Sequence, residues 1–394
     1  MLAHSLPWFT FWRAALDHRE RLQTVLRGEI PDCVPVAPDF SNMVPARLTG
    51  KPFWDLYLYN DPPPWEAYIA CARHFDIDAV MDGYFPLTFP EEVPADAQEW
   101  EPYIVFESDE RIVTQRGRRD SGRLEWQPQV DVYHVADSPN RGVLPGRVGL
   151  PPEPGKPVPV EGIRAVDRGP TGLARVKELM GDQGLVGTFL VGSVVLGNAP
   201  AVYEYYDHPD KYEALAEKRV ADVEARFERI MGMEVQPDFL CVGGSGTLVF
   251  QTVEIFRRIA LPAVKRGIEL ATAAGFPTHV HSCGPQAELV RIMVEETDLT
   301  VIDPLEPPPM GDCDLAELKR LYGDRITLKG NLHTTEVMLH GTPEQVARAS
   351  RDAIDAAGSG GRFILSTGDQ CGRDTPDENL RAMVETARTY GRYE

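Results

Sequence analysis

His281 and Cys283 are the two residues whose types and spacing point most directly to chemistry. They stand two positions apart at the end of an apolar, β-branched run, and side chains two apart on a strand face the same way. A neutral imidazole and a thiolate on one face suit a borderline-soft metal ion such as zinc. Because a His-x-Cys pair also arises by chance, a buried structural cysteine beside a turn-capping histidine is the competing interpretation.

A third ligand from elsewhere in the chain favours the metal site. Cys371 lies in the segment 368–372 (GDQCG), just past another expected strand. Three protein ligands leave one coordination position open, which is typical of catalytic rather than structural zinc. Asp303, Glu306 and Asp369 are the candidates for the fourth position. The sequence therefore predicts His281, Cys283 and Cys371 as metal ligands.

Polar residues also follow the other expected strands. Gly244 and Ser245 belong to the segment 243–247 (GGSGT), whose amides either cradle an anion or form a bare tight loop. His279 reads as a hydrogen-bonded core histidine. For Asp39, as for Asp82, a cap or turn role competes with a functional one. The remaining assignments are a catalytic role for Asp303, Glu306 and Asp39, and substrate or cofactor binding by Gly244, Ser245, Asn331, His333 and Asp369.

These residues need an element pattern that brings them together. Short apolar runs alternate with longer amphipathic segments, including 200–233, 252–274 and 286–297, and helices are also expected to open at Thr342-Pro343 and Thr375-Pro376. Strands that alternate with helices pair in parallel through right-handed crossovers. The eight expected strands are 34–37, 78–81, 186–191, 239–242, 278–281, 299–302, 326–329 and 363–366.

Eight such units predict an α/β fold, a (β/α)8 TIM barrel, in which polar residues at the C-terminal strand ends converge on one mouth. The alternative is an open doubly wound sheet, but no Gly-rich nucleotide loop follows an early strand. Pro and Gly gather between residues 84 and 167, where the β-like runs 103–108 and 111–114 flank a polar break. We therefore expect a single barrel domain over 1–394, with 84–167 inserted after the second strand as β-hairpins and Pro/Gly-rich loop.

Composition narrows the function classes. The 394 residues carry a formal net charge of −20, which argues against nucleic acid or anionic lipid as a partner. We find no run of 18 apolar residues and no signal-peptide pattern, so we expect no membrane association. Six Cys in this length read as reduced thiols in a cytoplasmic protein rather than as a disulfide framework.

Four motifs resemble the uroporphyrinogen decarboxylase superfamily over roughly residues 185–394. They are 281–284 (HSCG), 328–332 (LKGNL), 341–346 (GTPEQV) and 375–380 (TPDENL), and residues 20–83 resemble it more weakly. The superfamily has the (β/α)8 fold. Its decarboxylases carry an Arg-rich entry motif near the N-terminus, but the corresponding segment 37–42 (APDFSN) contains no Arg. The chain is more similar to the cobalamin-linked methyltransferase branch.

That branch binds zinc through His-x-Cys and a later Cys, so the resemblance implies zinc at His281 and Cys283. Counting back six residues from Thr375, where the family places its later Cys, gives Asp369 rather than Cys371. The third ligand is therefore either Cys371 or Asp369. A carboxylate in place of a thiolate would leave the ion more Lewis acidic.

The resemblance implies a zinc-dependent methyltransferase that moves a methyl group between a corrinoid such as methylcobalamin and a small thiol or methylated small molecule. The chain has no Asp-x-His-x-x-Gly run, so we expect the corrinoid on a separate protein or free. A homodimer is implied by the family alone. The alternatives are a metal-free decarboxylase or lyase acting on a small carboxylated substrate, with Asp39 or Asp303 at the substrate, and a barrel that only binds a corrinoid or tetrapyrrole.

Overall fold

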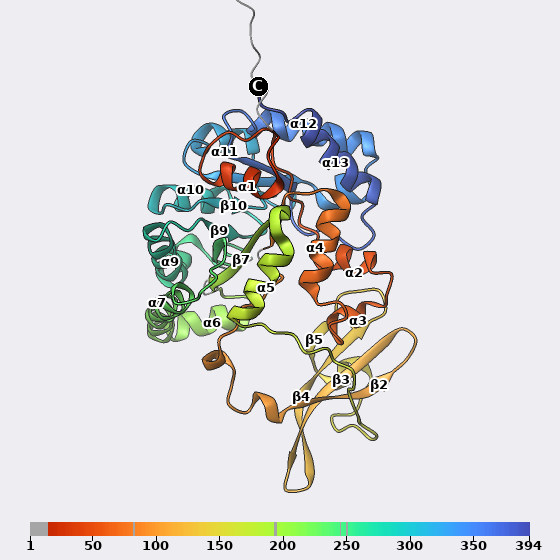
Figure 1. The fold of residues 1–394 in the computed structure, drawn as a ribbon. Coiled ribbons are helices and arrows are strands. Elements are labelled where there is room, and N and C mark those ends of the chain that lie inside the picture. The colour runs from red at the N-terminus through yellow and green to blue at the C-terminus, as the bar shows by residue number, and fades with distance from the viewer. Residues whose placement is uncertain (1–14, 82, 193–194, 245, 250) are drawn as a thin grey trace, which may run out of the picture.

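The computed structural model describes residues 15–81, 83–192, 195–244, 246–249 and 251–394, and all structural statements concern those residues. Helices and strands alternate along most of this part of the chain, and a separate group of strands lies at one end of the molecule (Figure 1). No helix within the described ranges is long and apolar enough to cross a membrane.

A curled parallel sheet of seven strands forms the centre of the fold. Each strand of this sheet pairs in parallel with the sheet's next strand in sequence order, as the alternating pattern predicts. The sequence therefore identified the α/β class and seven of the eight expected strands. In sheet order the strands are β1 (Ala79–Met81), β7 (Gly184–Val191), β8 (Phe239–Val242), β9 (Thr278–His281), β10 (Val301–Asp303), β11 (Thr327–Leu332) and β12 (Phe363–Thr367).

The eighth expected strand, 34–37, is not a strand in the structure. It forms only an isolated parallel bridge between Val36 and Leu365 of β12. Two features of this segment limit its pairing. Pro35 has no N–H to donate, and the Val36 N–H donates to the side chain of Asp78 at 2.7 Å instead of to a neighbouring strand. The observed sheet is thus seven-stranded.

Helices connect successive strands of the parallel sheet. The expected helix 200–233 is two helices, because Pro209 cannot continue the hydrogen bonding of the helix before it and starts a new one. Thr342 caps its helix as expected, with a reciprocal Gln345 contact. Thr375 does not cap the last helix, since Pro376 keeps an extended backbone with ψ 138°. The helices are α1 (His18–Leu26), α2 (Met43–Leu48), α3 (Phe53–Tyr57), α4 (Pro64–Phe75), α5 (Pro170–Met180), α6 (Ala199–Asp207), α7 (Pro209–Met231), α8 (Val253–Ile255), α9 (Leu261–Ala273), α10 (Ala287–Glu296), α11 (Leu315–Tyr322), α12 (Pro343–Ala357) and α13 (Asp377–Thr389).

A second, antiparallel sheet lies between β1 and α5 in the sequence. The expected runs 103–108 and 111–114 fall in its first hairpin, and a small cluster of Val113, Val130 and Val132 packs within it. A one-domain description with this segment as an insertion stays a prediction. In sheet order the strands are β5 (Asn140–Val143), β4 (Arg123–His134), β3 (Arg111–Asp120), β2 (Glu101–Glu107) and β6 (Val158–Pro159).

The two ends of the parallel sheet are covered differently. Leu22 and Val25 of α1 pack against Leu185, Phe239 and Ile364, which lie at or near the beginnings of their strands. Helix α1 therefore closes the N-terminal strand ends, and the antiparallel sheet lies at the opposite end of the molecule (Figure 1). The C-terminal strand ends, where barrel enzymes place their chemistry, face away from α1.

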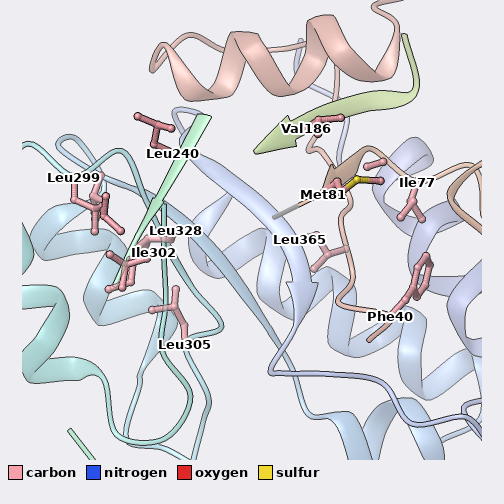
Figure 2. Close-up of a cluster of buried hydrophobic side chains, with 14 of the residues drawn as sticks. Phe40, Ile77, Met81, Val186, Leu240, Leu299, Ile302, Leu305, Leu328 and Leu365 are labelled. Atoms are coloured by element: carbon pink, nitrogen blue, oxygen red, sulfur yellow. The ribbon is translucent and has the colours of Figure 1, made fainter. Parts of the chain in front are cut away.

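A continuous apolar core holds the strands and helices together. Figure 2 shows part of it, with Met81, Val186, Leu240, Leu328 and Leu365 contributed by five different strands. All five side chains are essentially inaccessible to solvent. Strands buried on both faces are typical of a parallel sheet whose faces are both covered.

One buried carboxylate, Asp78, joins both ends of the chain to the start of β1. Asp78 is fully buried and pairs with Arg21 at 2.6 Å, Arg388 at 2.8 Å and His18 at 3.0 Å. Burial raises the pKa of this carboxyl, but the guanidinium groups of Arg388 and Arg21 outweigh it and hold the pKa far below its usual range. Asp78 therefore links α1, α13 and the parallel sheet through ionic hydrogen bonds.

Candidate functional site

Asp303 is the centre of a buried polar cluster at the C-terminal ends of β9 and β10. The register of the two strands places Asp303 directly opposite His281. The Asp303 Oδ1 atom lies 2.8 Å from His279 Nε2 and 3.2 Å from His281 Nδ1. Its Oδ2 atom pairs with the amine of Lys329 on β11. Three neighbouring strands thus supply one carboxylate, two imidazoles and one ammonium.

The charges around Asp303 fix its protonation state. Burial raises the pKa of Asp303, but the positive charge of Lys329, together with His279 and His281, holds that pKa well below its usual range. Asp303 is therefore a carboxylate at neutral pH. Its position opposite His281 Nδ1 orients the imidazole so that Nε2 faces the other way. Histidines that ligate metals typically have this kind of carboxylate on their second ring nitrogen.

Two further carboxyl groups lie around His281. Asp369 Oδ1 is 3.7 Å from His281 Nε2 and also accepts the Gln370 N–H at 2.9 Å. Glu306 is 4% exposed and accepts a hydrogen bond from the Gly284 N–H. Burial raises the pKa of Glu306, and the negative charge of Asp369 raises it further. The site therefore combines the ionised carboxylate of Asp303 with the carboxyl of Glu306, which binds a proton more readily.

The backbone at Asp369 is unusual for a residue with a side chain. Its φ of 134° lies where L-residues are rarely found, because Cβ crowds the backbone there. This conformation sets the direction of the Asp369 side chain in the loop after β12. The loop geometry thus decides which side chain of 368–372 faces His281, and that side chain is Asp369 rather than Cys371.

Cys371 has a different environment from His281 and Cys283. It is fully buried, and burial raises the pKa of its thiol to about 12. Its N–H donates to the Asp39 carbonyl oxygen at 2.8 Å. No three His, Cys, Asp or Glu side chains among the described residues are arranged to share one metal ion. The structure therefore does not assemble the expected set of His281, Cys283 and Cys371.

The other expected site residues have mainly structural partners. Asn331 Nδ2 donates to the Leu305 carbonyl at 3.0 Å. His333 Nδ1 accepts two backbone N–H groups at 3.2 Å and caps the helical turn 334–339. The Asp39 side chain accepts the Ser41 N–H at 2.8 Å, the turn role that competes with its catalytic assignment.

The Gly-rich loop after β8 touches the candidate site through Ser282. The Thr247 N–H donates to Ser282 Oγ at 3.2 Å, and the Gly244 carbonyl accepts the Thr247 hydroxyl at 2.6 Å. Ser245, the other residue expected to bind here, lies outside the described residues, as does Asp82. An anion cradle formed by this loop stays a prediction.

Lys329 is the member of the cluster that sequence reasoning missed. The sequence places it in the expected strand 326–329 and in the 328–332 motif without a role, yet its side chain is 6% exposed and reaches Asp303. The signal was present in the sequence: a lysine in the middle of a strand expected to be buried needs a buried partner. His279, expected to be a hydrogen-bonded core histidine, has that role through Asp303.

Comparison with known proteins supports the resemblance. The family model described as uroporphyrinogen decarboxylase (URO-D) matches residues 198–390. A methylcobamide:CoM methyltransferase of Methanosarcina mazei is 30% identical over 35% of this chain and 37% of its own length. A uroporphyrinogen decarboxylase of Anaeromyxobacter dehalogenans is 26% identical over 61% of this chain and 66% of its own length. The matched part of this chain thus spans little more than a third of the methyltransferase.

A solved structure agrees with the fold. A methyltransferase from Methanosarcina mazei superposes with a TM-score of 0.55 at 17% identity, covering 95% of this chain and 99% of the other. At this identity the likeness concerns the fold alone. It extends over nearly the whole chain, whereas the family model matches its C-terminal half.

Proposed function

We propose that this chain, whose residues 198–390 match the uroporphyrinogen decarboxylase family model, is a zinc-dependent, corrinoid-linked methyltransferase. It would move a methyl group between a corrinoid, carried by a separate protein or free, and a small thiol or methylated small molecule. The observation that carries the proposal is the arrangement of His281, which has Asp303 on one ring nitrogen and Asp369 facing the other.

The types of side chain around His281 suit a zinc ion, although no three of them among the described residues are gathered around one point. We propose His281, Cys283 and Asp369 as its ligands, and Cys371 as the alternative third ligand. Imidazole nitrogen, thiolate sulfur and carboxylate oxygen are the donors that zinc takes in proteins. When bound, zinc would supply Lewis acidity that lowers the pKa of a thiol or activates a methylated leaving group.

The residues of the chain itself would position the reactants and the protons. Asp303, held ionised by Lys329, keeps His281 Nδ1 protonated and the ring fixed. Glu306, whose pKa is raised by burial, would take up or release the proton of the incoming or departing group. Burial around these groups excludes water and strengthens their electrostatic interactions.

We propose that the segment 34–37 closes the curled sheet into a (β/α)8 barrel. Its support is a pair of backbone hydrogen bonds to β12, from Ala37 N to Leu365 O and from Leu365 N to Pro35 O, both at 2.8 Å. On its other side the Asp78 N–H donates to Val36 O at 2.9 Å, beside the start of β1. In a closed barrel the residues after 34–37, including Asp39, join the same mouth as His281.

A metal-free decarboxylase is the second candidate. The observation that favours it is the Anaeromyxobacter dehalogenans decarboxylase, which matches more of this chain than the methyltransferase of Methanosarcina mazei does. Asp39 and Asp303 would then interact with a small carboxylated substrate. Turnover that is unchanged after chelation would favour this candidate.

The decisive experiment is elemental analysis of the purified protein together with methyl transfer assayed with methylcobalamin. We expect stoichiometric zinc, lost together with activity in Cys283→Ser. Cys33→Ser is the matched control, since it changes a buried cysteine beside Arg388 that belongs to neither ligand set, and it should retain zinc. Zinc retained in Cys371→Ser would assign the third position to Asp369, and zinc lost there would assign it to Cys371. Asp303→Asn should weaken zinc binding by about 10–100-fold, because it removes the carboxylate that orients His281. Protein without zinc, or full activity in Cys283→Ser, would refute the proposal.

A further inference from the structure

A cavity of about 480 Å³ lies between helices α3 and α4 and the connection from β4 to β5. Its walls come from segments far apart in the sequence: the turn after the 34–37 segment, the start of α4, the residues after β1, the connection between β4 and β5, and the loop after β12. The lining residue Gln370 directly follows Asp369, which faces His281. The cavity is therefore next to the candidate metal site.

Two arginines line this cavity, and they are only partly neutralised. Arg141 donates to the Tyr133 hydroxyl at 3.4 Å, and its ion-pair partner Asp131 is 3.6 Å away. The guanidinium of Arg168 has no hydrogen bond or ion pair among the described residues. Partial burial lowers the pKa of Arg168, and the nearby charge of Arg141 lowers it further. Asp39 is the single acidic residue among the described lining residues.

This excess of positive charge is unusual in a chain with a net charge of −20. Like charges that line one cavity repel each other, and a bound anion removes that repulsion. A guanidinium presents its donors in a planar fork that matches a carboxylate. The arrangement therefore fits a planar oxyanion.

The rest of the wall supplies an apolar face and one unused acceptor. Trp65 packs edge-on against Phe85 with ring centroids 5.3 Å apart, and Tyr84 packs on Tyr68 at 4.1 Å, so both lining rings are held in place. The side-chain oxygen of Asn42 is buried and accepts no hydrogen bond from any described residue. Buried polar atoms rarely stay unsatisfied, and a ligand donor is one way to satisfy this one.

We propose that the cavity binds a small organic acid, with its carboxylate between Arg141 and Arg168 and its apolar body against Trp65 and Tyr84. The inference rests on the proposed function only for the role of that acid as a reactant, because Gln370 places the cavity beside Asp369. Binding itself needs neither zinc nor a corrinoid. The antiparallel sheet would thus contribute to substrate selection through Arg141.

The test is calorimetric titration of the purified full-length protein without corrinoid. The probes are benzoate, acetate, inorganic phosphate and benzyl alcohol, a neutral analogue of benzoate. We expect benzoate to bind more tightly than acetate and phosphate, and benzyl alcohol to bind at least tenfold more weakly. Arg168→Gln and Arg141→Gln should each weaken benzoate binding about tenfold to a hundredfold. Arg168→Lys should retain part of the affinity because it keeps the charge.

Arg147→Gln is the matched control. Arg147 is an exposed arginine from the same stretch of chain that does not line the cavity, so its replacement should leave benzoate affinity unchanged. Circular dichroism checks that each variant is folded. The proposal would be overturned if benzyl alcohol bound as tightly as benzoate, or if phosphate bound more tightly than benzoate. It would also be overturned if Arg168→Gln bound benzoate as tightly as the wild type, or if neither carboxylate bound. None of these binding measurements depends on methyl transfer. Failure of the proposed reaction would therefore leave their outcome unchanged, and the two proposals can fail independently.

Discussion

The ion pair between Lys329 and Asp303 offers a direct test of how the buried cluster is held together. The two side chains are 6% and 1% exposed. Removing one partner of a buried pair leaves an uncompensated charge and costs about 3–5 kcal/mol. We therefore expect Lys329→Met to lower the free energy of unfolding by about that amount, toward the lower end because His279 and His281 still face the Asp303 carboxylate.

The double variant separates the interaction energy of the Lys329–Asp303 pair from the energies of the contacts that each residue makes with other groups. Asp303→Asn alone leaves the Lys329 ammonium buried without its carboxylate, so it should be destabilising as well. Asp303→Asn combined with Lys329→Met removes both charges. Its cost should fall short of the sum of the two single costs by about 0.5–3 kcal/mol, the coupling expected for residues in contact. Urea unfolding monitored by circular dichroism measures all three differences at neutral pH.

The pair Lys218–Asp222 is the control for this experiment. Its side chains are 69% and 43% exposed and stand four residues apart on α7. Lys218→Met should cost no more than about 0.5 kcal/mol, because exposed pairs are screened by water. The reasoning is refuted if Lys329→Met costs no more than Lys218→Met, or if the effects of Lys329→Met and Asp303→Asn simply add.

The pH dependence of the same variants gives a second readout. The pKa of Asp303 is lower in the folded state than in the unfolded state. The ionised Asp303 therefore contributes its full stabilisation above the unfolded-state pKa of about 3.9, and this stabilisation is lost as pH falls through the folded-state pKa. The stability difference between the wild type and Lys329→Met should therefore be largest near neutral pH and shrink on acidification. A difference that stays constant from pH 7 to pH 3 would contradict this assignment.

Three more predictions concern other groups. Asp78→Asn should cost about 3–5 kcal/mol at pH 7 and flatten the acid side of the stability profile, because the depressed pKa of Asp78 stabilises the fold only above that pKa; urea unfolding from pH 7 to pH 3 measures this. Alkylation of the native protein at pH 8, followed by mass spectrometry, should modify Cys283 and spare Cys371, whose thiol is buried with a pKa of about 12; early labelling of Cys371 would count against the structure. Burial lowers the pKa of Lys319 to about 8, so stability should rise between about pH 8 and the unfolded value near 10.4; the same unfolding assay should show that rise absent in Lys319→Met.

The sequence by itself determined the order of helices and strands. It also determined which side chains meet at the ends of neighbouring strands. Seven strand segments were predictable because apolar, β-branched runs between amphipathic helices form buried parallel strands regardless of distant context. The proximity of His281 and Asp303 followed as well, since the C-terminal ends of neighbouring parallel strands meet at one edge. The His279 environment could also be anticipated from its inward position on the same strand.

Only the tertiary structure decided the features that depend on long-range geometry. The position of Asp369 rather than Cys371 beside His281 is set by a loop backbone with φ 134°, which no spacing rule encodes. The 34–37 segment formed a single bridge because a distant carboxylate, Asp78, took the Val36 N–H. The arginine-lined cavity is assembled from segments more than 300 residues apart, from Asp39 to Gln370. Local patterns fix which residues are buried, whereas contacts between distant segments fix which charges meet.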